Sequence, residues 1–336
     1  MPRKNDPTLA GIGEWGFLNR LLPRLQRRSA GAFLVAPGDD AAVLSGGDRP
    51  VLSIDGLTDG THFRSAWDRR LQNLLGISLG RALAWKLLGS CVSDLASMGV
   101  TARRWAMIYL GAPGSARISF LEDLYSGLDE AARRQDVSLA GGDTVRAKDV
   151  SIVAAVGASL KGRPLTRRGA RAGMKWCLGG NVGDAAAGLA VLDGKEKSVS
   201  PADARVFVRR FFDVRPQLEL GARLSRERGV GGAMDVSDAL SDSLSIFCRD
   251  SGVGAEIDLE SLPLSAAFRR HFSAETALTG GEDYVLLFAA EPAVARRLEH
   301  AAGITVIGDV TPRRRGVGYR RAGRRICVAD AFQHFS

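Results

Sequence analysis

The stretch AWKLLGSCVSDLASMG, residues 84–99, decides the fold more than any other part of this chain. It closes a longer run, Leu71–Met98, in which apolar residues recur at helical spacing, and Gly99 can end the helix in the left-handed conformation of a C-cap. Asp94 falls inside this helix among small side chains. Because a buried carboxylate without a partner is costly, we expect a metal ion beside Asp94.

Aspartate recurs beside glycine or serine at other places where a strand or helix should end. Taken singly, such residues have an ordinary explanation, since Asp and Ser cap helices and Gly-Asp forms turns. Taken together, they supply the oxygen ligands that Mg²⁺ prefers alongside water and phosphate. The six clusters are Gly38-Asp39-Asp40, Ser53-Ile54-Asp55, Ser93-Asp94, Gly141-Gly142-Asp143, Asp235-Val236-Ser237-Asp238 and Gly280-Gly281-Glu282-Asp283.

The 336 residues exceed what one hydrophobic core usually holds, so we expect two domains of α/β (α+β) class. A Gly-, Pro- and Arg-rich stretch, residues 162–173, is the expected junction, which gives domains 1–162 and 163–336. The expected strands are Val51–Ile54, Trp105–Leu110, Val137–Ala140, Ile152–Val156, Trp176–Gly179, Ala233–Val236, Tyr284–Ala289 and Thr305–Ile307. Beyond Leu71–Met98, the expected helices are Asp184–Leu192, Asp203–Phe212, Pro216–Glu227, Asp238–Arg249 and Pro292–His300.

The net charge of +9 is mostly scattered arginine, without the interleaved aromatic residues of a nucleic-acid stacking surface. We therefore expect a solvated surface, with small-anion binding as the next reading and no nucleic-acid partner. The four cysteines lie far apart, which disfavours a zinc site or disulfides and fits a reducing compartment. No apolar run has the length of a signal peptide or membrane span, so a cytoplasmic protein is expected.

Several kinds of active site are disfavoured by the sequence. Residues Gly11–Gly16 match G-x-G-x-x-G, but no strand precedes them, so we interpret them as a helix-entry turn. A Walker A motif, a G-x-S-x-G motif and an H-E-x-x-H motif are all missing, and there are only four histidines. Many carboxylates without a nucleophile and base fit phosphoryl transfer, where catalysis is mainly positioning and charge neutralisation.

The order of these motifs resembles the thiamine-monophosphate kinases, part of an ATP-binding superfamily that includes aminoimidazole ribonucleotide synthetase. The likeness implies an N-terminal sheet domain that dimerises and a larger C-terminal α/β domain. It runs along nearly the whole chain, through segments 38–43, 53–63, 93–99, 141–144, 166–167, 183–189, 234–238 and 281–284.

The resemblance implies that ATP phosphorylates thiamine monophosphate to thiamine diphosphate by in-line transfer, with several Mg²⁺ ions and no side-chain acid or base. The implied partners are these two small molecules and a second copy of the chain. The implied metal ligands are Asp40, Ser53, Asp55, Asp94, Asp143, Asp235 and Asp238. The implied ATP contacts are Gly142, Asp143, Arg167 and Ser237, and the substrate contacts are His62, Glu282 and Phe332.

The chain departs from the family pattern at Ile54, where Thr is usual, at Cys91, where Asn is usual, and at Ala239, where Gly is usual. Ala36-Pro37-Gly38 also replaces the usual Gly-Ile-Gly. The runner-up function is therefore another ATP-dependent enzyme of the superfamily with a different acceptor, such as an amidine-forming synthetase or a maturation factor. A catalytically weak ATP-binding paralogue is disfavoured, because retained carboxylates without metal would repel one another.

Overall fold

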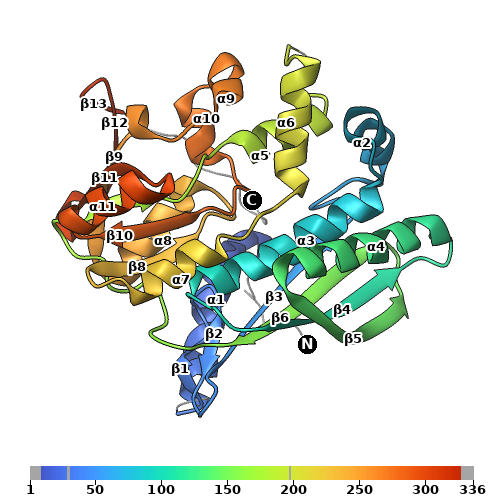
Figure 1. Cartoon of the computed structure of the whole chain (residues 1–336), viewed down its shortest axis with the longest axis horizontal. Helices are drawn as coiled ribbons and strands as arrows, with labels where there is room; N and C mark the ends of the chain where they lie inside the picture. Colours follow the sequence, from blue (N-terminus) through green and yellow to red (C-terminus); the bar gives the residue numbers. More distant parts are fainter. Residues whose placement is uncertain (1–8, 29–30, 197, 327–336) are drawn as a thin grey trace.

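Two sheets form the framework of the chain, and helix α3 (Leu79–Ser97) contacts strands of both (Figure 1). The computed structural model describes residues 9–28, 31–196 and 198–326. Helices pack against the sheets, and the chain has the expected α/β (α+β) class. The boundary between domains 1–162 and 163–336 remains a prediction, and one continuous apolar core includes residues from both sides of it.

The first sheet has the strand order β1-β2-β3-β6-β4-β5, in which only β4 and β5 pair in parallel. Side chains alternate along β4, with Ala106 and Ile108 buried while Trp105 and Met107 are exposed. This period of two follows from the pleat of a strand. The bounds are β1 Phe33–Val35, β2 Ala42–Leu44, β3 Pro50–Thr58, β4 Arg104–Ala112, β5 Val137–Arg146 and β6 Ser151–Ser159.

The single helix expected over Leu71–Met98 is wrong, because the chain bends by 96° near Gly76. Gly76 adopts a φ of 68° and ends α2 (Asp68–Leu75) as a left-handed C-cap. The Ser78 hydroxyl then accepts the Arg81 N–H and starts α3. Apolar residues on both sides of the bend face the core, so their spacing alone does not reveal it. Gly99, with a φ of 80°, follows the end of α3 as expected.

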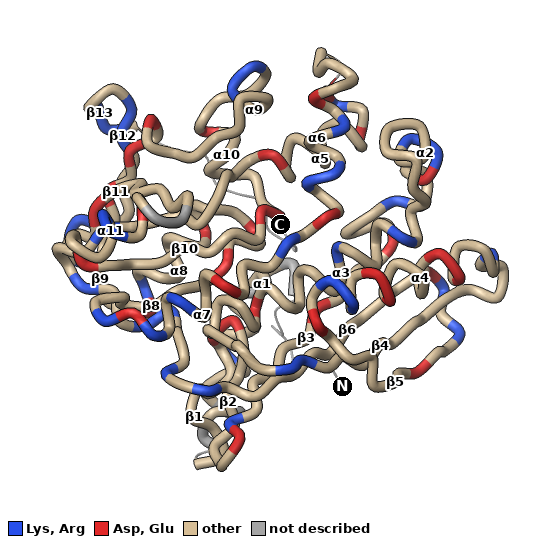
Figure 2. The backbone as a smooth tube through the Cα atoms, viewed as in Figure 1, with Lys and Arg blue, Asp and Glu red and all other residues tan. Residues whose placement is uncertain are grey.

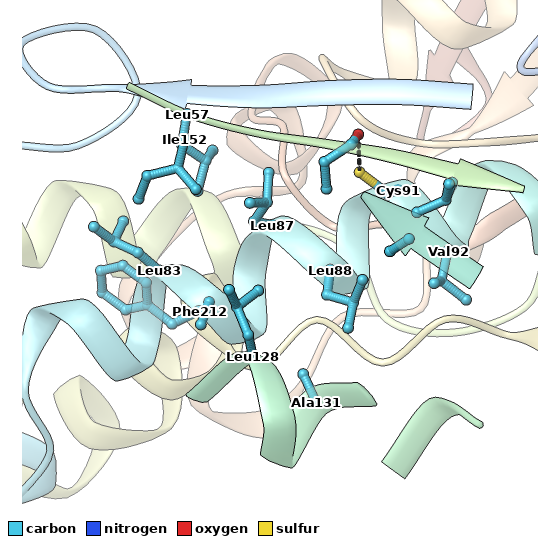
Figure 3. Close-up of a cluster of buried hydrophobic side chains, with 14 of the residues drawn as sticks. Leu57, Leu83, Leu87, Leu88, Cys91, Val92, Leu128, Ala131, Ile152 and Phe212 are labelled. Atoms are coloured by element: carbon cyan, nitrogen blue, oxygen red, sulfur yellow. Dashed lines mark hydrogen bonds between the residues drawn. The ribbon is translucent and has the colours of Figure 1, made fainter. Parts of the chain in front are cut away.

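Helix α3 is buried along almost its whole length, unlike a surface helix with one apolar stripe. Leu87, Leu88 and Val92 pack with side chains of β3, β6 and α4 (Ile118–Gln135) (Figure 3). The Cys91 thiol lies in the same core and donates a hydrogen bond to the Ala154 carbonyl oxygen at 3.4 Å. Each fully buried leucine contributes about 2 kcal/mol, so α3 is a rigid base for its polar side chains.

The second sheet has the order β13-β12-β9-β11-β7-β10-β8, and only β12 and β9 pair in parallel. The expected helices and strands of this half are confirmed within a few residues. The strands are β7 Lys175–Leu178, β8 Val230–Asp235, β9 Val253–Asp258, β10 Leu286–Ala290, β11 Thr305–Pro312, β12 Val317–Arg321 and β13 Arg324–Ile326. The helices are α5 Asp184–Leu192, α6 Pro201–Phe212, α7 Leu218–Arg226, α8 Leu240–Ser251, α9 Ala266–His271, α10 Ala274–Thr279 and α11 Pro292–Ala302.

The largest unexpected element is α1 (Leu9–Arg28), which contains the G-x-G-x-x-G match. These glycines lie inside the helix, which is kinked at Gly13 (φ 65°, ψ 174°). The expected helix-entry turn is therefore replaced by a kink within one helix. Helix α4, strands β9, β12 and β13, and helices α9 and α10 were also not expected. Three short 3₁₀ helices complete the described chain: η1 Ser65–Trp67, η2 Leu259–Ser261 and η3 Arg313–Arg315.

Basic residues are distributed over all parts of the fold rather than gathered on one element (Figure 2). Their scatter agrees with the interpretation of the net charge of +9 as solvated surface. Among the described residues, no single helix is both long and apolar enough to cross a membrane. Only the bent pair Ser65–Leu75 and Leu79–Ser97 has the length and composition to do so.

Helices α7 and α3 approach so closely that residue 221 must be glycine. A Cβ added there would lie 1.9 Å from the Ala96 carbonyl oxygen. Gly221→Ala is expected to lower the free energy of unfolding by about 2–3 kcal/mol, because overpacking forces the backbones apart. Urea unfolding measures this loss. Gly114→Ala is the control, since a Cβ at 114 meets nothing within 4 Å; equal stability of both variants would contradict the close packing.

Candidate active site

A cleft of about 450 Å³ is lined by helices α1 and α3, strand β3 and the segment just before β2. Loops that flank strands of the second sheet complete the lining. The cleft gathers seven of the predicted site residues from segments far apart in the sequence. The lining residues are Leu18, Leu22, Gly38, Asp39, Ile54, Asp55, His62, Asp94, Arg167, Ser237, Asp238, Glu282 and Tyr284. The cleft thus brings together Asp55, His62, Asp94, Arg167, Ser237, Asp238 and Glu282.

Asp94 is the half-buried centre of the acidic group. The Ser53 hydroxyl on β3 donates a hydrogen bond to Asp94 Oδ2 at 2.5 Å, which joins two predicted ligands. Burial raises the pKa of Asp94 well above its usual range, and the charges of Asp235 and Asp40 raise it further. Burial, together with Asp40, likewise raises the pKa of Asp235 to about 7. Ionisation of these carboxyl groups is therefore energetically unfavourable in the absence of a cation.

Arg167 offsets part of this charge. Its Nε donates to Asp40 Oδ1 at 2.7 Å, and a second guanidinium nitrogen contacts the same oxygen. Its backbone N–H donates to both carboxylate oxygens of Asp39, at 3.2 and 3.3 Å. Burial alone would lower the pKa of Arg167, but Asp40 and Asp39 raise it above its usual range. The guanidinium is therefore a fixed positive charge beside the acidic group, in the lining of the cleft.

The donor set fits a divalent cation that keeps water and phosphate oxygens in its coordination shell. Asp40 Oδ2 and Asp235 Oδ2 are buried oxygens without a hydrogen-bond partner, which is the kind of group a cation would satisfy. Within the described ranges, no three acidic, His or Cys side chains converge into a ready-made metal site. Mg²⁺ is usually bound by one or two carboxylates, with substrate phosphates supplying other ligands, and a cation held here would take its further ligands in this way.

Two loops bring His62 and Glu282 to the cleft. His62 lies in the turn after β3, and its Nδ1 accepts the Thr58 N–H at 3.1 Å. Glu282 lies in the loop before β10, where its N–H donates to the Ser237 carbonyl oxygen at 2.6 Å. A Cβ at residue 281 would lie 1.5 Å from the Asp238 carbonyl oxygen, so Gly281 allows this loop to lie against the Ser237–Asp238 segment.

Gly142 and Asp143 are not brought to this cleft. They lie on the edge strand β5, which is separated from β3 by β4 and β6. Asp143 stands in register with Gly56 across those strands, about 14 Å away at the usual strand spacing. Gly142 has a structural reason to be glycine, because a Cβ would lie 1.8 Å from the Ile108 carbonyl oxygen. Phe332 lies outside the described residues.

The departures from the family pattern sit at the cleft or under it. Ile54 lines the cleft and is 68% exposed, so an apolar side chain replaces a hydroxyl there. Cys91 is fully buried behind the acidic group, and burial, with the charges of Asp55 and Asp94, raises the pKa of its thiol well above its usual range. It is therefore an inert core side chain rather than a metal ligand. Ala239 is buried at the N-cap position of α8.

Sequence reasoning missed three charged or polar residues of the site. Asp39 lines the cleft, and burial raises its pKa to about 6 with help from Asp40. Tyr284 also lines the cleft. Lys86 is buried on α3 and pairs with Glu282 at 2.8 Å. The signal for Lys86 was its position in a helix with almost no other charged residue, and the signal for Asp39 was its place beside Asp40.

Known proteins match the whole chain. The model of the AIR synthase related protein N-terminal domain matches residues 38–159, and that of the C-terminal domain matches residues 171–320. A thiamine-monophosphate kinase from Synechococcus elongatus is 32% identical over 99% of this chain and 99% of its own. The thiamine-monophosphate kinase of Escherichia coli K12 is 32% identical over 96% of this chain and 98% of its own.

The fold agrees with the sequence match. A solved structure of AaThiL complexed with AMPPCP and TMP superposes with a TM-score of 0.82 at 25% identity, covering 98% of this chain and 100% of the other. The order of the acidic motifs, the two sheets and the full-length identity to the kinases point to one relationship. The chain belongs to the thiamine-monophosphate kinases, within the AIR synthase related proteins.

Proposed function

We propose that this protein transfers the terminal phosphoryl group of ATP to thiamine monophosphate, forming thiamine diphosphate and ADP. The observation that carries the proposal is that the acidic group around Asp94 and the two loops bearing His62 and Glu282 line the same cleft. The relatives named thiamine-monophosphate kinase support the reaction. The AaThiL complex supports the pair of ligands, since AMPPCP is an ATP analogue.

The acidic group would hold Mg²⁺ with ATP. Asp40, Ser53, Asp55, Asp94, Asp235 and Asp238 are the proposed ligands on this side of the cleft, and Asp143 of the partner subunit is the seventh. Bound Mg²⁺ neutralises charge on the phosphates and orients them for in-line transfer. The buried oxygens of Asp40 and Asp235 without hydrogen-bond partners support this assignment.

The chain's own side chains bind and orient the reactants. Arg167 presents a fixed cation beside the acidic group, a position suited to phosphate oxygens. Ser237 lines the cleft beside Asp238 and is the proposed nucleotide contact on that loop. The acceptor phosphate has a second pKa of about 6 and is largely ionised at neutral pH. It needs no general base, which fits a cleft whose lining includes a single histidine among the described residues.

An acceptor comparison tests the function. Purified protein is incubated with ATP, Mg²⁺ and either thiamine monophosphate, unphosphorylated thiamine or no acceptor, and nucleotides and thiamine esters are separated by chromatography. The proposal predicts ADP and thiamine diphosphate in equal amounts with the monophosphate alone. ATP consumption without thiamine diphosphate would favour the runner-up, an enzyme of the superfamily with another acceptor.

We also propose that the protein acts as a homodimer. One face of the first sheet is apolar and exposed, and the exposed fraction is 38% for Trp105, 49% for Met107 and 38% for Tyr109. Leu52 and Ile54 on β3 continue the same kind of surface. A contiguous apolar surface on a sheet face is a common mark of a protein–protein interface. A second copy covering it would place β5, and with it Asp143, at the interface, where the partner's cleft can use this carboxylate.

Met107→Asp is expected to convert the dimer to a monomer, because a carboxylate buried in an apolar interface is costly. Sedimentation or light scattering at micromolar concentration measures the change. Activity should fall with the dimer fraction while the far-UV circular dichroism spectrum stays the same. Tyr125→Asp, on the exposed side of α4, is the control. A monomeric wild-type protein, or a dimer unaffected by Met107→Asp, would overturn this interface.

The described cysteines are consistent with a reducing compartment. Cys91, Cys177 and Cys248 are all buried free thiols, as is usual for proteins of the cytoplasm. We propose that the enzyme acts there.

A further inference from the structure

Lys86 is a buried cation paired with Glu282, a side chain that lines the cleft. The Lys86 side chain is 1% exposed, in the middle of the apolar helix α3. The ammonium donates to Glu282 Oε2 at 2.8 Å and to the Phe211 carbonyl oxygen at 3.1 Å. It also stands 3.7 Å from the centre of the Phe211 ring, a distance at which the ring face attracts a cation.

The two members of this ion pair differ in solvent exposure: Lys86 is buried, and Glu282 is partly exposed. Burying an ammonium is costly unless it is paired and hydrogen-bonded. Lys86 satisfies this requirement through a carboxylate that itself stays 26% exposed and lines the cleft. One end of the pair is therefore fixed in the core, and the other lines the cleft.

The loop that carries Glu282 is held in an unfavourable backbone conformation. Glu282 and Tyr284 have φ values of 70° and 49°, in the left-handed region that residues with a Cβ rarely adopt. Tyr284 donates its N–H to the Val236 carbonyl oxygen at 2.8 Å, and its buried hydroxyl interacts with the Glu282 carboxylate. Such strain persists where surrounding contacts fix it and is common at ligand sites.

We propose that Lys86 is a positioning residue that orients Glu282 toward the acceptor substrate. It binds Glu282 Oε2, and the carboxylate, which Tyr284 also contacts, keeps acceptor capacity for a hydrogen bond from a donor on a cationic, amino-bearing ring system. The inference rests on the proposed function, since thiamine monophosphate has both an amino group and a positively charged ring. Lys86 and Asp94 lie eight residues apart on α3, about 12 Å along the helix axis, so the effect of Lys86 falls on the acceptor and not on Mg²⁺–ATP.

Steady-state kinetics of Lys86→Met, Glu282→Gln and the double variant test this role. Each single variant is expected to raise KM for thiamine monophosphate by about tenfold or more, with KM for ATP changed less than about twofold. The double variant should show no further rise, because both changes remove the same interaction. Arg81→Met is the matched control: Arg81 is also on α3 and pairs with Glu130 at 2.8 Å, outside the cleft.

A purely structural Lys86 would lower the melting temperature of Lys86→Met but leave KM for the acceptor unchanged, and this result would overturn the proposal. Glu282→Gln keeps the inference testable if Lys86→Met does not fold, since an unchanged KM in that variant also overturns it. Additive effects in the double variant would do the same. A wild-type protein that forms no thiamine diphosphate overturns the proposed function first, and this inference with it.

Discussion

Asp94→Asn is expected to lower kcat by roughly 10²–10³-fold, the loss typical of removing one electrostatic contact to the transition state. Asn keeps the size of the side chain and can still accept the Ser53 hydrogen bond, so the cleft should keep its shape. What it lacks is the negative charge that holds a cation against phosphate. Kinetics at saturating ATP and thiamine monophosphate, with Mg²⁺ varied, measure the loss.

The same substitution should not destabilise the metal-free protein. The pKa of Asp94 is raised by burial and by neighbouring carboxylates, so replacing it with a neutral group removes repulsion. Loss of activity with equal or higher stability therefore separates a metal ligand from a core residue. Asp129→Asn, at an exposed ion pair with Arg133 on α4, is the control. Full activity of Asp94→Asn at saturating Mg²⁺ would show that Asp94 is not a metal ligand.

Stability of the metal-free protein is expected to fall as pH rises from about 4 to 7. Asp39, with a pKa of about 6, and Asp235, with a pKa of about 7, both exceed the value of an unfolded aspartate. The folded state then keeps protons that the unfolded state has released, so the stabilisation is complete below about pH 4 and is lost as pH rises through the folded pKa values. The rise in the pKa of Asp39 alone corresponds to a loss of about 3 kcal/mol.

Mg²⁺ with AMPPCP should reverse this trend, because a cation binds the ionised carboxylates and a ligand of the native state raises its stability. Urea unfolding at pH 5 and pH 8 measures the free energy of unfolding under two conditions. One contains EDTA, and the other contains Mg²⁺ and AMPPCP. The expected result is a larger ligand-induced gain at pH 8. Asp235→Asn in EDTA should show a weaker fall with pH. The same gain at both pH values would contradict a cluster that titrates in this range.

The short acidic motifs could be predicted because each joins a fixed backbone feature to a charged side chain. Asp94 stood out as a carboxylate within an apolar helix, and it proved to be half-buried at the cleft, where it accepts a hydrogen bond from Ser53. Helix α5 was also predictable, since Gly183 and Asp184 begin a short apolar run that ends at Leu192. In such places local sequence and global fold favour the same structure.

The remaining features depend on contacts between distant segments. The bend at Gly76 was hidden because apolar spacing continues through it. The Lys86–Glu282 pair joins residues 196 positions apart, and no local pattern connects them. The distance of Asp143 from the cleft follows from strand order, which the sequence left undetermined.

The most direct test of the central claim follows the phosphoryl group itself. The protein is incubated with Mg²⁺, thiamine monophosphate and ATP labelled with ³²P at its terminal phosphate, and the products are separated. The proposed reaction predicts label in thiamine diphosphate, in step with ADP formation and lost in the presence of EDTA. Label released only as inorganic phosphate, or no transfer while Mg²⁺–ATP binds, would contradict it.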